Sequence, residues 1–215
     1  MKENFIETQY DVTKKSRVKI FYEKNKKILF FALFSFVILI FSFFYYIESK
    51  ANKIILLSDN YIEAKVQLEQ GNKNVATKIL QDVVYENHPT YSTLSFFLIL
   101  NENLIKEDDE IRNMFDHLIK NNKIEKEVKN LLVFKKSLYL SNFSNESELI
   151  DVLKPLINKE SLWKPHALLL LGDYFYSKKE FVKSKEFYMK ILLLKNIDNE
   201  FYNEVNSRLA LILND

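Results

Sequence analysis

The sequence has no cysteine and only two glycines, three prolines and one tryptophan among its 215 residues. Without cysteine, the chain can form no disulfide, no thiolate nucleophile and no cysteine-ligated metal centre. The loops that hold nucleotide phosphates need several glycines at fixed spacing, and no such pattern is present. There is also no G-x-S-x-G segment of the kind that presents a nucleophilic serine. These absences exclude several large classes of enzyme.

Histidine is scarce as well, and the three histidines do not form a recognisable site. His88 precedes a proline, His117 follows Asp116, and His166 follows Pro165. No pair has the spacing of a zinc site, and none has carboxylates at ligand spacing. The acidic stretch 106–112 is better explained by a turn followed by a helix start. We therefore predict no catalytic residue, no metal site and no cofactor.

Charge is distributed unevenly along the chain. Residues 1–47 hold eight Lys and Arg against four Asp and Glu, whereas the whole chain has a net charge of +2, so residues 48–215 carry a net charge of −2. The basic character therefore belongs to the N-terminal segment. A nucleic-acid-binding function of the larger part has little support.

Residues 28–47 read ILFFALFSFVILIFSFFYYI, twenty residues without a charge. A helix of this length spans about 30 Å, the thickness of a bilayer's hydrocarbon core. Leu, Ile, Val and Phe fill fifteen of the positions, and Tyr45 and Tyr46 stand where an interfacial aromatic belt would lie. We predict a transmembrane helix at 28–47, a basic segment at 1–27 and one folded domain at 48–215.

The alternative to a permanent anchor is a cleaved signal peptide, although the apolar region of such a peptide is usually shorter. Seven Lys and Arg residues precede the span between Lys14 and Lys27, while the other side opens with Glu48 and mixed charge. The positive-inside rule then places the N-terminus in the cytoplasm and the domain outside. In a bacterium the domain would be periplasmic and the anchor would lie in the inner membrane.

The domain shows helical periodicity nearly throughout, with apolar residues at steps of three and four. Breaks at Gly71, near Asp108, at Ser144 and near Lys179 mark turns about 35 to 37 residues apart. Helix hairpins that recur near 34 residues are typical of tetratricopeptide-type solenoids. We predict an all-α fold of about four helix hairpins followed by a C-terminal capping helix.

The fourth unit carries the tetratricopeptide pattern most fully. Leu171-Gly172 is followed by Phe175, Phe181, Ser184 and Tyr188 at the spacing of the repeat, with Ser184 in place of the usual alanine. The first unit matches more thinly, and the second and third have the helices but lack the small residues. We expect Gly172 to allow close approach of two helices rather than to contact a ligand.

Two further local features carry structural predictions. Asn145, with Glu148 three residues later, resembles a capping box at a helix start. Trp163 is expected to pack at the junction of the third and fourth units, with a partner contact as the alternative.

The whole architecture resembles the YfgM-like family, which comprises ancillary subunits of the bacterial Sec translocon. The segments that carry the resemblance are KNKKILFFALFSFVILI, LEQGNKNVATKILQDVV, WKPHALLLLGDYFYSKKEFVKSKEFYMKIL and SRLALIL. The resemblance implies an inner-membrane anchor and a periplasmic tetratricopeptide-like domain that contacts the translocon, periplasmic chaperones or exported clients. The second and third units depart from the family's frequent Ala and Gly.

The repeat geometry predicts which residues line a concave partner-binding face. They are Tyr61, Lys65 and Leu68 in the first unit, and His166, Leu169, Asp173 and Tyr176 in the fourth. Tyr176 is the first choice because tyrosine is enriched at interface hot spots, and packing against the third unit is its alternative role.

Three other functions stay open at this point. One is a scaffold for another envelope complex, such as outer-membrane protein assembly or cytochrome maturation. Another is a homo-oligomeric tether, and the third is a periplasmic enzyme.

Overall fold

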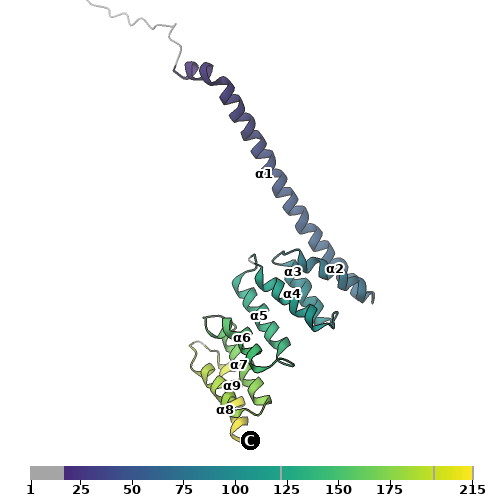
Figure 1. The fold of residues 1–215 in the computed structure, drawn as a ribbon, viewed down its shortest axis with the longest axis vertical. Coiled ribbons are helices and arrows are strands. Elements are labelled where there is room, and N and C mark those ends of the chain that lie inside the picture. Colours follow the sequence, from purple (N-terminus) through teal and green to yellow (C-terminus); the bar gives the residue numbers. More distant parts are fainter. Residues whose placement is uncertain (1–16, 122, 196, 215) are drawn as a thin grey trace, which may run out of the picture. The chain divides into compact units, whose positions relative to one another are not determined.

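The computed structural model describes residues 17–121, 123–195 and 197–214, and within them every regular element is an α-helix (Figure 1). The predicted all-α class is therefore confirmed. The helices follow in the order α1 (Arg17–Glu69), α2 (Lys73–Tyr85), α3 (Tyr91–Asn101), α4 (Asp108–Lys120), α5 (Lys126–Leu140), α6 (Glu146–Ile157), α7 (Lys164–Ser177), α8 (Phe181–Leu192) and α9 (Asn199–Asn214).

The predicted span lies inside α1, which continues on both sides of it. By length and composition, α1 could cross a membrane, and its apolar side chains at 28–47 are exposed. The basic residues Lys14 and Lys15 lie outside the described residues. The chain divides into two compact units between Leu56 and Leu57, and Leu57 is the first buried residue of α1. The second unit starts at Leu57, within α1, whereas the predicted domain starts at residue 48.

In the second unit the helices stack in chain order, each packing on the next from α2 to α9. Contacts also join every second helix. Among the even-numbered helices, polar pairs separated by 29, 36 and 37 residues join α2 to α4, α4 to α6 and α6 to α8. Ring contacts do the same for the odd-numbered helices, from Tyr61–Tyr91 between α1 and α3 to His166–Phe201 between α7 and α9. The unit therefore has two rows of helices, named here the odd row and the even row.

The sequence predicts that two helices approach closely at Gly172, and the packing of α8 on α7 confirms it. A methyl group on Gly172 would lie within 2.9 Å of three atoms of the Tyr188 ring, so α7 and α8 could not pack this closely with any larger residue. The Ser184 hydroxyl donates a hydrogen bond of 2.8 Å to the Gly172 carbonyl. Ser184 is therefore the small counterpart of Gly172, as expected.

A second close approach was missed in the sequence. The first helix of the second predicted hairpin, α3, packs on α2, and its Ser92 and Ser95 are both fully buried. The Ser92 hydroxyl donates a hydrogen bond of 2.7 Å to the carbonyl of Val83 and so satisfies its own polar group. The second predicted hairpin therefore does have small buried residues, but they are serines three positions apart instead of the alanine and glycine typical of the repeat.

Three of the turns between paired helices share one backbone design. Gly71, Asn103 and Lys179 have positive φ values of 83°, 49° and 61°. At each turn this residue donates to the carbonyl three residues back, and the next residue donates to the carbonyl five back, as in Gly71→Leu68 and Asn72→Gln67. This is the Schellman arrangement, which favours glycine at the left-handed position. Lys179 holds that position at a steric cost.

The Gly172→Ala substitution should lower the free energy of unfolding by about 1–3 kcal/mol, because the added methyl group overlaps the Tyr188 ring. Denaturation followed by the fluorescence of Trp163 measures it. The same substitution should cost clearly less in a Tyr188→Leu background. Since alanine otherwise favours a helix over glycine, unchanged or increased stability of the single variant would contradict the close approach.

The Lys179→Gly substitution should raise the free energy of unfolding by about 1 kcal/mol, because glycine adopts positive φ without the steric cost of a Cβ. Gly71→Ala should lower it by a similar amount. Lys178→Gly is the matched control, since Lys178 has a φ of −85° and gains nothing from glycine. Equal effects at positions 178 and 179 would show that the turn is not strained.

Candidate protein-binding face

The three predicted residues of the first unit lie on α1 within the odd row. Tyr61 and Leu68 are half-buried and pack against the core around the fully buried Ala64, and Lys65 between them is exposed. Tyr61 also contacts the ring of Tyr91 on α3, with 6.3 Å between the ring centroids. Of the three, Lys65 presents the most surface to a partner.

The four predicted residues of the fourth unit share the side of α7 that meets α9. The His166 ring lies 5.1 Å from that of Phe201, and Leu169 joins the apolar cluster around Val205. Asp173 pairs with Arg208 of α9, with 3.0 Å between Oδ1 and Nε. At this end of the odd row, the chain's own last helix therefore covers part of the predicted groove.

A hollow of about 190 Å³ remains beside this contact, lined by Asp173, Tyr176, Tyr188, Arg208 and Leu211. Asp173 is its polar centre, since it also accepts a hydrogen bond of 2.6 Å from the Tyr188 hydroxyl. Burial, and then this hydrogen bond, raise the pKa of Tyr188 well above its usual value, so the phenol remains a neutral donor. Tyr176, the first choice from the sequence, lies at the wall of this hollow and against the ring of Phe181 at 5.5 Å.

Two aromatic residues of the odd row were missed in the sequence. Phe97 of α3 lies under the Lys135 ammonium of α5 at 5.3 Å, and Phe134 of α5 stacks on Trp163 at 5.5 Å. Both phenylalanines are half-buried and link successive odd helices. The stacking also confirms that Trp163 packs at the junction of the third and fourth units. The sequence signal that could have found Phe97 and Phe134 is their separation of 37 residues, close to the repeat length. It was missed because the repeat motifs of the second and third predicted hairpins are weak.

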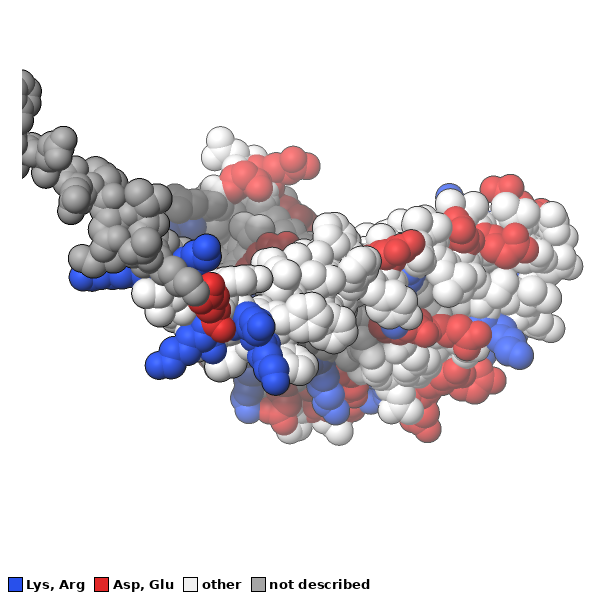
Figure 2. All heavy atoms as spheres, turned by 90° about the horizontal axis from the view of Figure 1, so that it is seen from above, with Lys and Arg blue, Asp and Glu red and all other residues white. Residues whose placement is uncertain are grey.

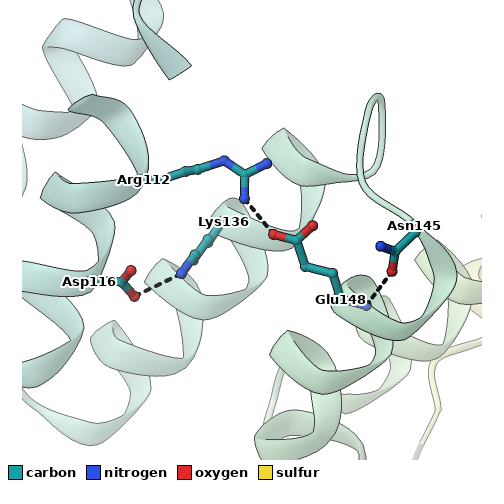
Figure 3. A network of polar contacts seen from close by, with 5 residues as sticks. All are labelled: Arg112, Asp116, Lys136, Asn145 and Glu148. Carbon is teal, nitrogen blue, oxygen red and sulfur yellow. Dashed lines mark hydrogen bonds and ion pairs between the residues drawn. The ribbon is translucent and has the colours of Figure 1, made fainter. Parts of the chain in front are cut away.

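Charged side chains link α4, α5 and α6 in the middle of the stack (Figure 3). Arg112 of α4 pairs with Glu148 of α6, and Lys136 of α5 reaches Asp116 of α4 at 2.7 Å. Asn145 accepts a hydrogen bond of 2.9 Å from the Glu148 backbone N–H, which confirms the capping half of the predicted motif. The Glu148 carboxylate, however, pairs with Arg112 instead of completing a capping box. The hydrogen bond from Arg112 lowers the pKa of Glu148.

On the face shown in Figure 2, side chains of both signs are interspersed and separated by broad uncharged areas. A face that binds a polyanion is expected to carry an extended patch of positive charge, and this face has none. Contacts on a surface of this kind depend on local apolar groups and individual ion pairs.

The histidines take part in ring and backbone contacts. His88 Nδ1 accepts a hydrogen bond of 3.2 Å from the Tyr91 N–H, and the His117 ring packs on Tyr85 at 4.9 Å. His166 contacts Phe134, Trp163 and Phe201. Across residues 17–121, 123–195 and 197–214, no three His, Asp or Glu side chains gather closely enough to hold a metal ion.

Comparisons of the sequence and the structure with known proteins yield no family model, no curated protein and no solved structure that matches.

Replacing Glu148 with glutamine should lower the free energy of unfolding at pH 7 by less than about 1 kcal/mol, because the pair is partly exposed. The folded-state pKa of Glu148 is depressed, so the stabilisation exists above the unfolded-state pKa of about 4.3 and is lost as the pH falls through the lower folded-state value. Denaturant titrations between pH 7 and pH 3 measure the difference between wild type and variant. A difference that persists at the acid end would mean that the carboxylate charge is not the cause, and Asp151→Asn, at an exposed i,i+3 pair, is the control.

Proposed function

We propose that this chain is a non-enzymatic protein-binding module, held at a membrane by α1 and built on a tetratricopeptide-like solenoid. The observation that carries the proposal is the regular linkage of every second helix at separations of 29 to 37 residues. Stacks of helix pairs with this period form extended surfaces that commonly receive a peptide or a partner helix.

The odd row is the proposed binding face, with Lys65 and His166 as its exposed members among the predicted residues. Its aromatic residues offer apolar area at low cost in conformational entropy, as is usual at protein interfaces. The α7 end of this face is shared with α9, so a partner has more free surface towards α1, α3 and α5.

The resemblance to the YfgM-like family supports a more specific role, that of an accessory subunit of the Sec translocon which links export to periplasmic chaperones. In this role α1 is a single-pass inner-membrane anchor, the N-terminus is cytoplasmic and the stacked helices are periplasmic. Within the described residues, the one long apolar helix supports this topology, and so do the lysines that precede its apolar stretch in the sequence.

Site-specific photo-crosslinking of the full chain in intact membranes tests the proposal. A photoreactive amino acid in place of Lys65 or His166 should capture translocon subunits, whereas the exposed Lys78 on α2 is the matched control position. Capture of a different envelope complex, with no translocon subunit, would overturn the export role. Capture of only a second copy of the chain would favour a homo-oligomeric tether instead.

A further inference from the structure

The last helix, α9, already occupies one end of the proposed binding face. Its Phe201 ring contacts His166 at 5.1 Å, and its Arg208 pairs with Asp173 at 3.0 Å. Leu169 belongs to the apolar cluster that α7 and α8 form with α9. Because these three residues of α7 are among those that the repeat pattern predicts for partner binding, the side chains of α9 show which chemistry fits this end of the face.

The surface under α9 is apolar, so it suits a helix rather than an extended polar segment. Leu168 and Ile191 are 4% and 0% exposed in the cluster that Val205 of α9 completes. If α9 left without a replacement, these side chains would meet water, which is unfavourable. The occupant of this end of the face must therefore bring an apolar side of its own.

The side chains of α9 define a pattern of four apolar positions and one basic position. The apolar members lie on one side of the helix at steps of four, four and three residues, and all belong to the cluster: Phe201, Val205, Leu209 and Ile212. Arg208 supplies the cation that meets Asp173. Another helix with the same apolar spacing and a basic residue in the same place could make the same contacts, as is typical of a helix in a groove.

Compared with α2 to α8, α9 is held by few buried contacts. Among its residues 199–212 only Val205 is buried, whereas each of α2 to α8 buries at least three residues. The side chains of Arg208 and Asp173 are each 39% exposed, and Arg208 also reaches Glu204 of its own helix at 3.4 Å. A partly exposed ion pair adds little to stability. Segments held in this way open locally at low cost, so α9 can leave while the stack stays folded.

We propose that α9 is an autoinhibitory segment, which competes for the α7 end of the binding face with a helix of a different protein that carries the same side-chain pattern. The inference rests on the proposed function as a protein-binding module. It adds the regulation of the site and the chemistry of the partner, namely apolar residues along one side of a helix and a cation that meets Asp173.

A second copy of the chain is a poorer competitor than a different protein. Exchange of α9 between two copies would only reproduce the contacts that each copy already makes, and it would cost the freedom of two separate molecules. A different helix can add contacts towards α5 that α9 does not make. Such a partner can displace α9 with a net gain.

A peptide with the sequence of α9 serves as the partner in a direct test. The probe is a fluorescein-labelled synthetic peptide of residues 198–214, DNEFYNEVNSRLALILN, titrated with the full chain in lipid nanodiscs and followed by fluorescence anisotropy against empty nanodiscs. It begins at Asp198 because this residue accepts a hydrogen bond of 2.7 Å from the Phe201 N–H and so caps the helix. In the wild type the attached α9 competes at a high effective concentration, so we expect weak but saturable binding.

Substitutions that release the attached α9 should strengthen binding of the peptide. Val205→Asp places a carboxylate in the apolar cluster, and we expect about tenfold tighter binding than by the wild type. Arg208→Glu, at a partly exposed position, sets a carboxylate against Asp173 and should give about threefold. Asn203→Glu is the matched control, because Asn203 is exposed on the same helix, and it should leave binding unchanged. Circular dichroism checks that each variant keeps its helices.

A second peptide, with Arg208→Glu, tests the chemistry of the partner. It keeps the apolar side but replaces the cation that meets Asp173, so the Val205→Asp chain should bind it about fivefold more weakly than the unchanged peptide. Equal affinity for the two peptides would overturn the proposed partner chemistry. Equal binding of the unchanged peptide by wild type and Val205→Asp, or binding by neither, would overturn the autoinhibitory contact. Binding by Val205→Asp with none by the wild type would make α9 a permanent cap and would also overturn it.

A second copy as the occupant is a separate outcome. A dimer of the wild-type chain in detergent that Arg208→Glu abolishes would assign the groove to α9 of another copy and would overturn the proposal. Translocon capture at Lys65 is measured on α1, whereas the peptide reports on the α7 end of the face. The failure of the proposed function and the failure of this inference therefore give different results.

Discussion

The Tyr188 ring lies directly on Gly172, and the C-terminal half of the stack depends on this contact. It lets α7 and α8 approach closely enough for Ser184 to bond to the carbonyl of Gly172. It also places the Tyr188 hydroxyl on Asp173, and Asp173 in turn holds Arg208 of α9. One missing side chain thereby determines how three helices meet. A protein with so few glycines uses this one where an added Cβ would overlap the Tyr188 ring.

Local sequence signals predicted much of the fold because they report properties of single helices. Periodicity indicates which side of a helix is apolar, and Gly172 with Ser184 indicates where two helices approach. The Schellman turn at Lys179 and the buried serines of α3 could not be predicted in this way. Lysine is rarely found at positive φ, and serine is ordinarily a surface residue, so tertiary packing overrode the usual preferences at Lys179, Ser92 and Ser95.

The candidate site shows the same division. Helical spacing placed His166, Leu169, Asp173 and Tyr176 on one side of α7, and they lie there. That α9 covers part of this side depends on the path of the chain after α8, which no local pattern encodes. The Arg112–Glu148 pair was likewise hidden, because its 36-residue separation becomes a contact only once the even helices stack in register.

The order of contacts along the chain has a consequence for how the protein folds. Each helix of the second unit packs on its neighbours in sequence and on the helix two places away, so its long-range contacts close loops of a few tens of residues. Such a chain has a low contact order, and chains of this kind fold quickly. A helix that emerges during synthesis finds the helices that precede it in the stack already present. The second unit can therefore fold progressively from its N-terminal end, so that α8 and α9 join the stack after the helices that precede them.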